Sequence, residues 1–98
     1  MMATTSAPAW GGRRASQALD RVRTLGARNG TPCAVCHGRI DYRLRYPDPW
    51  SCSVQHIPSR AVAPERTWDP AAWFPAHLQC NKEDGDGTRV SPYDLGFT

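Results

Sequence analysis

A small α+β domain stabilised by a bound metal is the fold class that this sequence predicts, on three observations. The chain has 98 residues, which is the length of one domain near the lower limit for a single hydrophobic core. Nine prolines and eight glycines divide it into short segments, so long helices and a wide sheet are hard to place. Four cysteines offer the disulfides or the metal that chains of this size usually need.

The amino-terminal third is basic and predicts one amphipathic helix. Residues 1–12 are small and interrupted by Gly and Pro, and we expect them to be disordered. Residues 13–27 carry apolar side chains at helical spacing and predict a helix that ends at Gly26 or at Asn29-Gly30. In the first forty residues a single acid, Asp20, accompanies six arginines: Arg13, Arg14, Arg21, Arg23, Arg28 and Arg39. Such an arm suits a polyanion, although a solvated helix face explains the charges equally well.

The rest of the chain predicts short elements within the same single domain, whose core spans about residues 31–84. Residues 31–42 read as a tight knuckle in which Gly38 takes a positive φ. Residues 51–57 predict a short strand, and residues 58–71 an irregular connection. Pro75 is expected to open a helix that runs to about Lys82. The flexible "EDGDGT" and a carboxy-terminal extension over 85–98 follow.

The chain contains no candidate membrane span or secretion signal. No run reaches the ~18 apolar residues that a span requires, and the amino terminus lacks the apolar core of a signal peptide. We therefore expect a cytoplasmic protein. In a reducing compartment, paired cysteines hold a metal more often than they form disulfides.

Two pairs with x-x spacing carry the strongest chemical signal. Cys33-x-x-Cys36 and His77-x-x-Cys80 together make a Cys3His set, which is a closed tetrahedral set for structural zinc. A helix would bring His77 and Cys80 to one side. The alternatives are a redox Cys-x-x-Cys and a pair of disulfides, but no βαβ pattern follows Cys36. Cys52 is expected to be a buried small residue, and the remaining histidine of this region, His37, a surface residue.

The ordered motifs "CAVC", "SVQHIPS", "WDPAAWFPAH" and "HLQCN" resemble the HNH endonucleases, particularly the small zinc-stapled ones of phage and actinobacterial genomes. The resemblance covers about residues 31–96, including the trailing "DLG". It implies a ββα-metal fold of the His-Me finger type, in which a β-hairpin and a helix hold one divalent ion over the DNA backbone.

The same resemblance implies a role for four positions. His56 matches the general base that takes a proton from the attacking water. Gln55 stands where the family usually has an Asp ligand of a catalytic Mg²⁺ or Mn²⁺, and its amide oxygen attracts the ion less than a carboxylate would. Asn81 matches a second ligand of that ion, although its own chemistry also suits a helix end. Ala72 replaces the Asn that normally orients the base, and it offers neither donor nor acceptor.

These observations predict a metal-dependent endonuclease that hydrolyses DNA phosphodiesters and is weakened at Gln55 and Ala72. Double-stranded DNA is the expected partner of a monomer or weak dimer, and family context adds the phage terminase. The alternative is a non-catalytic, zinc-stapled module for nucleic-acid binding or assembly. Bulky residues are assigned to the core, and basic ones to DNA or to solvent. The core set is Trp50, Trp68, Trp73 and Phe74, and the basic set is Arg13, Arg14, Arg21, Arg60, Arg66 and Lys82.

Overall fold

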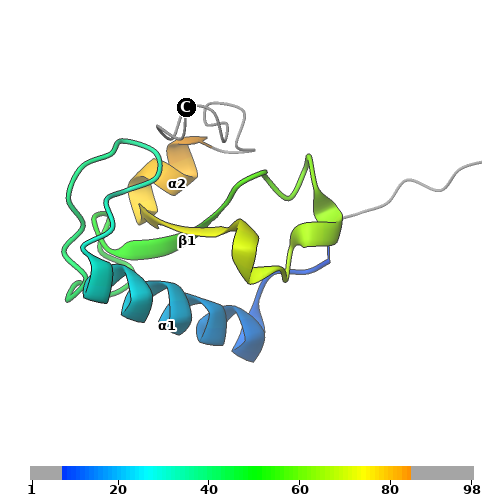
Figure 1. Cartoon of the computed structure of the whole chain (residues 1–98), viewed down its shortest axis with the longest axis horizontal. Helices are drawn as coiled ribbons and strands as arrows, with labels where there is room; N and C mark the ends of the chain where they lie inside the picture. Colours follow the sequence, from blue (N-terminus) through cyan, green and yellow to red (C-terminus); the bar gives the residue numbers. More distant parts are fainter. Residues whose placement is uncertain (1–7, 85–98) are drawn as a thin grey trace, which may run out of the picture.

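The computed structural model describes residues 8–84 and has two helices that enclose a two-stranded antiparallel sheet (Figure 1). The small α+β class is therefore confirmed. Residues 1–7 lie outside the described part, as do the extension over 85–98 and most of "EDGDGT". The elements are α1 (Gly12–Asn29), β1 (Cys52–His56), the 3-10 turns η1 (Pro64–Arg66) and η2 (Pro70–Ala72), β2 (Trp73–His77) and α2 (Leu78–Asp84).

Helix α1 forms where the apolar spacing predicts it, and it is slightly longer at both ends. Its buried residues Ala18, Val22 and Gly26 are four apart, so they lie on one face and leave the arginines on the others. Gly30 ends the helix with φ 64°, and its N–H bonds the Gly26 carbonyl. This left-handed cap favours glycine because a Cβ is strained there. The second of the two predicted helix ends is therefore the observed one.

Strand β1 covers five of the seven residues predicted to be extended, and its side chains alternate between the two helices. Cys52 and Val54 belong to one buried cluster with Val22 of α1. On the other face, Ser53 accepts a hydrogen bond from Asn81 of α2, and Gln55 donates one to Asp84 of α2. The strand thus presents an apolar face to α1 and a polar face to α2.

The helix expected to begin at Pro75 is wrong, because Pro75 lies inside β2 opposite Val54. Its carbonyl accepts the Ala34 N–H at 2.9 Å, so the main chain here points away from β1. In an antiparallel ladder such a residue forms no hydrogen bonds with its strand partner, and a missing N–H costs nothing. The prediction that His77 and Cys80 share a helix is also wrong, since His77 is the last residue of β2 and α2 begins one residue later.

The amino end of α2 is held by the turn that precedes β1. Leu78 donates its N–H to the Ser51 carbonyl at 2.8 Å, and Gln79 donates to the Pro49 carbonyl at 2.9 Å. The first amides of a helix have no partner within the helix, so this turn satisfies two of them. The connection fixes α2 against the start of β1.

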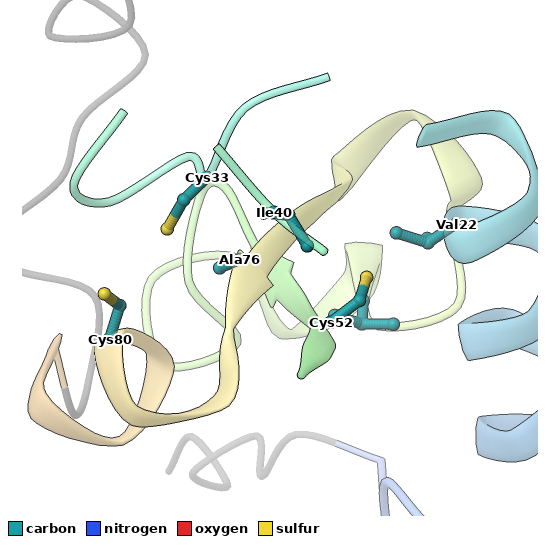
Figure 2. Packing of buried hydrophobic residues seen from close by; sticks show 7 residues of the cluster. Val22, Cys33, Ile40, Cys52, Ala76 and Cys80 are labelled. Carbon is teal, nitrogen blue, oxygen red and sulfur yellow. The ribbon is translucent and has the colours of Figure 1, made fainter. Parts of the chain in front are cut away.

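The hydrophobic core is small and is made largely of small side chains. Figure 2 shows part of the cluster that α1, the knuckle, both strands and α2 share: Val22, Cys33, Ile40, Cys52, Val54, Ala76 and Cys80. In the described chain the largest completely buried side chains are Thr67, Cys33 and Ser51. Such a core supplies little burial free energy for a chain of this length, so an additional stabilising element is expected.

The tryptophans only partly fill the core. Trp68, Trp73 and Phe74 are half-buried, but the prediction for Trp50 is wrong, because 53% of its surface is exposed. Trp10 lies in the segment expected to be disordered, yet it stacks on Trp68 with ring centroids 4.4 Å apart. The disordered assignment therefore does not hold for residues 8–12, the last of which already belongs to α1.

Candidate metal centre and the His56 site

Four side chains from three segments meet at one point. The sulfur atoms of Cys33, Cys36 and Cys80 and a ring nitrogen of His77 all lie within 4.8 Å of one another. The His77 Nδ1 atom is 3.4 Å from the Cys36 sulfur and 3.7 Å from the Cys80 sulfur. Tetrahedral zinc with bonds of about 2.0–2.3 Å places its ligand atoms about 3.3–3.8 Å apart. The cluster can therefore hold a structural ion such as zinc, as the spacing predicts.

The imidazole of His77 is turned so that Nδ1 faces the sulfurs. Its Nε2 atom lies 2.9 Å from the carbonyl oxygen of Arg39. A carbonyl only accepts hydrogen bonds, so Nε2 carries the proton and Nδ1 carries the lone pair. Metal-binding histidines are commonly oriented in this way by a carbonyl on the far side of the ring. The ring is therefore prepared for an ion before one binds.

Main-chain amides surround the Cys33 sulfur. It accepts N–H groups from Val35 at 3.4 Å, Cys36 at 3.5 Å and His77 at 3.4 Å. Burial of Cys33 disfavours its thiolate, but these N–H groups outweigh burial and lower the pKa of the thiol. Burial, followed by the charge of Cys33, raises the pKa of Cys80 to about 12. A bound cation offsets repulsion of this kind, because it attracts all the thiolates.

The knuckle turns at His37 rather than at Gly38. His37 has the positive φ of 64°, so the predicted role of Gly38 is wrong. A Cβ at Gly38 would instead lie 3.3 Å from the Cys36 sulfur, and the residue is small because the sulfur approaches it. The His37 side chain is exposed, as predicted, and is outside the cluster.

Cys52 takes no part in the cluster. Its side chain is 4% exposed, which confirms the buried assignment, and burial raises its pKa to about 11. Figure 2 shows its sulfur on the Val22 side, while the sulfurs of Cys33 and Cys80 turn toward each other on the far side of β2. All four cysteines are free, and the cluster brings together only three of them with His77, which is the arrangement of a metal site and not of two disulfides.

His56 ends β1 at a different place, and one of its ring nitrogens is bound. Its Nε2 atom lies 2.9 Å from the carbonyl oxygen of Thr67, which also accepts the Trp73 indole N–H at 3.0 Å. Because the carbonyl only accepts, Nε2 carries the proton and Nδ1 is left as an acceptor. Burial lowers the pKa of His56, as does the charge of Arg60. The ring is therefore neutral and able to take a proton near neutral pH.

Gln55 and Asn81 both form hydrogen bonds at the contact between β1 and α2. The Gln55 amide is 3% exposed and donates to the Asp84 carboxylate at 2.7 Å, while its own oxygen is buried without a partner. The Asn81 amide donates to the Val54 carbonyl at 2.8 Å and to the Ser53 hydroxyl at 3.1 Å. The two residues predicted to bind a catalytic ion thus both lie at the β1–α2 contact, where each has its own hydrogen-bond partners. Strand alternation turns them away from the His56 ring.

Asp84 is the residue of this region that the sequence analysis missed. It is 3% exposed and lies on α2 three residues after Asn81, which puts both side chains on one helix face. That spacing is the sequence signal that could have found it. Asp84 therefore places a carboxylate beside the Gln55 amide, at a position that has no carboxylate of its own.

Ala72 is completely buried at the end of η2. Its carbonyl accepts the N–H of Ile57 at 2.9 Å, so the main chain joins the residue after His56 to the start of β2. The hairpin end is therefore held by a main-chain hydrogen bond at the position where an asparagine is expected in the resembled family.

The basic residues predicted to contact DNA fall in two places. Arg60 lies near His56 and adds positive charge to its environment, whereas the Arg14 guanidinium sits 4.0 Å over the Trp68 ring, which reaches His56 only through Trp10. Arg13 and Arg21 are exposed on α1, and Lys82 is exposed on α2. Arg66 is paired with Asp69 at 3.1 Å, and part of its charge is therefore already compensated.

Comparison of the chain with known protein families, with curated proteins and with solved structures found no match. Among the described residues no helix is long and apolar enough to cross a membrane.

Proposed function

We propose that this chain is a metal-dependent endonuclease of the HNH type that hydrolyses DNA phosphodiesters. The observation that carries the proposal is the state of His56. The ring ends a strand of a hairpin whose partner strand ends in the cluster residue His77, and its Nε2 is bound to Thr67. A neutral imidazole with a free acceptor at Nδ1 is the group that general-base catalysis needs. The order β1, β2, α2 agrees with the ββα-metal fold.

In this proposal His56 activates water. Its Nδ1 takes a proton from a water molecule, and the resulting hydroxide forms a bond to phosphorus. The bond between phosphorus and the leaving oxygen breaks, and solvent supplies the proton that this oxygen gains. A held base of this kind contributes about 10²–10⁴-fold to the rate. The Thr67 hydrogen bond keeps the ring in the tautomer that the step requires.

Gln55 and Asn81 would hold the Mg²⁺ or Mn²⁺ of the proposed reaction. Their amide oxygens are hard ligands of the type these ions prefer, and the unpartnered oxygen of Gln55 fits such a role. An ion of this class, when bound, stabilises charge on the phosphate and on the leaving oxygen. Because the Gln55 and His56 side chains leave opposite faces of β1, the phosphate would have to lie across the edge of this strand to meet both the ion and the base. The Asp84 carboxylate beside Gln55 supplies the negative charge that two amides lack.

The basic residues support double-stranded DNA as the substrate. Arg60 lies near His56 and Arg14 lies over the Trp68 ring, and arginine binds phosphate in a planar, two-pronged geometry. Arg13, Arg21 and Lys82 would extend the contact along the backbone. Association with a phage terminase follows only from the family resemblance and is part of the proposal.

Plasmid nicking tests the proposal. Zinc-loaded protein with added Mn²⁺ or Mg²⁺ should convert supercoiled plasmid to open circles, and His56→Ala should lower the rate by about 10²–10⁴-fold. His37→Asn is the matched control, because His37 is exposed and outside the metal cluster, and asparagine tolerates its positive φ. If neither the natural chain nor Gln55→Asp nicks plasmid with either ion, the enzymatic proposal is wrong.

A second candidate is a non-catalytic module that binds nucleic acid or supports an assembly. It is favoured by the Gln55 amide, which donates to Asp84 where a metal-binding carboxylate is expected. DNA affinity measured against salt separates it from a purely structural domain. A steep loss of affinity as salt rises indicates phosphate contacts, whereas a flat dependence argues against DNA as the partner.

A further inference from the structure

We propose that Trp10 is a positioning residue for His56, held in place by a short amino-terminal segment that crosses the end of the hairpin. The role of Trp10 in catalysis rests on the proposed function, but its contact with His56 can be tested whether or not the chain is a nuclease. The segment comprises residues 8–11, which precede α1. In Figure 1 this dark blue segment runs up beside the green turns that follow β1.

Trp10 covers His56 within a group of aromatic rings. Its indole meets the imidazole edge to face, with centroids 4.5 Å apart and planes at 88°. The same indole stacks on Trp68 at 4.4 Å and 24° and meets Trp73 edge-on at 5.8 Å. Trp73 donates to the carbonyl that also binds His56. One indole therefore contacts the ring and both neighbouring indoles.

Contacts on both sides hold Trp10 where it is. Before it, the Pro8 carbonyl accepts a hydrogen bond from the Arg60 guanidinium at 2.6 Å. After it, Arg14 in the first turn of α1 places its guanidinium 4.0 Å over Trp68, on which Trp10 stacks. Aromatic pairs contribute about 0.5–1.5 kcal/mol beyond burial. These contacts together hold residues 8–11 in one defined position.

The position has two consequences for His56. First, the Thr67 hydrogen bond fixes one edge of the imidazole and Trp10 covers the ring, so rotation of the ring is restricted and Nδ1 keeps one direction. Second, the indoles of Trp10 and Trp68 lie where water would otherwise meet that side of the ring.

NMR relaxation of the His56 ring carbons, which reports how far the imidazole moves, tests the inference without any nuclease assay. In zinc-loaded protein, Trp10→Ala should lower the order parameter of the His56 ring, because the indole 4.5 Å from it no longer restricts its rotation. Trp10→Phe should stay close to the natural chain, since it keeps an aromatic wall. Tyr46→Ala is the control, because Tyr46 is 72% exposed and contacts none of these rings. Zinc content and thermal melting show whether each variant is folded.

The outcomes separate the inference from the proposed function. If the His56 ring is as rigid in folded Trp10→Ala and in folded Trp10→Leu as it is in the natural chain, Trp10 does not position the ring and the inference is wrong. Trp10→Leu serves if the alanine variant does not fold, because leucine keeps apolar volume without the indole. If the ring becomes more mobile in these variants but the natural chain never nicks DNA, the inference holds and the nuclease proposal fails. Where nicking occurs, Trp10→Ala should lower kcat by about 10-fold with little change in KM.

Discussion

The imidazole of His77 donates its Nε2 proton to the carbonyl of Arg39 across 2.9 Å, and Nδ1 therefore faces three cysteine sulfurs. Arg39 belongs to the knuckle, and His77 ends β2. The hydrogen bond joins the segment that carries Cys33 and Cys36 to the strand that leads into α2. A bound ion would close the same junction by four bonds. The hydrogen bond and such an ion would together connect segments that the small apolar core connects only weakly.

Loss of one cluster sulfur should unfold the domain. Structural zinc contributes about 10–16 kcal/mol, which equals or exceeds the whole unfolding free energy of about 5–15 kcal/mol of a typical domain. We expect Cys80→Ala to lose zinc and its cooperative thermal transition, as measured by elemental analysis and circular dichroism. Cys52→Ala, in which the removed sulfur is buried but outside the cluster, should keep zinc and lose only about 1–2 kcal/mol. If Cys80→Ala melts like the natural chain, an ion at the Cys3His cluster does not stabilise the fold.

A methyl group at Gly26 should destabilise the fold although it favours the helix. Alanine gains about 1 kcal/mol over glycine inside a helix. A Cβ at Gly26 would lie 2.5 Å from the Tyr42 hydroxyl, and Tyr42 is tied to the Thr31 carbonyl by a hydrogen bond. Such overpacking costs about 1–3 kcal/mol, so Gly26→Ala should lower the unfolding free energy in a denaturant titration. Gly11→Ala meets nothing within 4 Å and should leave it unchanged; equal results for the two variants would refute the close packing of Tyr42.

The elements that the sequence predicts well are those with a local signal. Helix α1 has apolar residues four apart, and a glycine cap follows it. The Cys3His cluster depends on two short spacings. Each of these patterns is complete within a few residues, so no knowledge of the remaining chain is needed to recognise it.

The features that were missed depend on contacts distant in sequence. Whether Pro75 can lie in a strand depends on which way its main chain faces relative to β1, and that is set by the register with Val54. Trp10 stands alone among Gly and Pro and has no periodicity, and its position comes from Trp68, far along the chain. The Gln55–Asp84 pair joins β1 to α2. Propensity and spacing contain none of this information.

Nicking should remain near its maximum from neutral pH down to below the ordinary histidine pKa. Burial lowers the pKa of His56 from 6.5, so the neutral base persists on acidification until pH falls below that value. The linkage has the same sign for stability: His56 favours the folded state above the unfolded pKa, and this contribution is lost as pH falls through the lower folded pKa. The pH profile of single-turnover nicking measures the acid limb. A midpoint above 6.5 would show that another group acts as the base.

A carboxylate at position 55 should strengthen ion binding and weaken the ion-free fold. Gln55→Asp removes the hydrogen bond to Asp84 and brings two buried carboxylates together, and like charges in a buried site repel. We expect a loss of about 1–3 kcal/mol without divalent ions. Added Mn²⁺ should reverse this loss, because an ion that binds only the folded state stabilises it. Thermal melting with and without Mn²⁺ measures both effects.

Gln79→Glu is the matched control for Gln55→Asp, since Gln79 is exposed and its side chain donates a hydrogen bond to Glu83 on α2, and it should show neither effect. If Mn²⁺ raises the melting temperature of both variants equally, the ion does not bind at Gln55, and the proposed catalytic metal must be placed elsewhere.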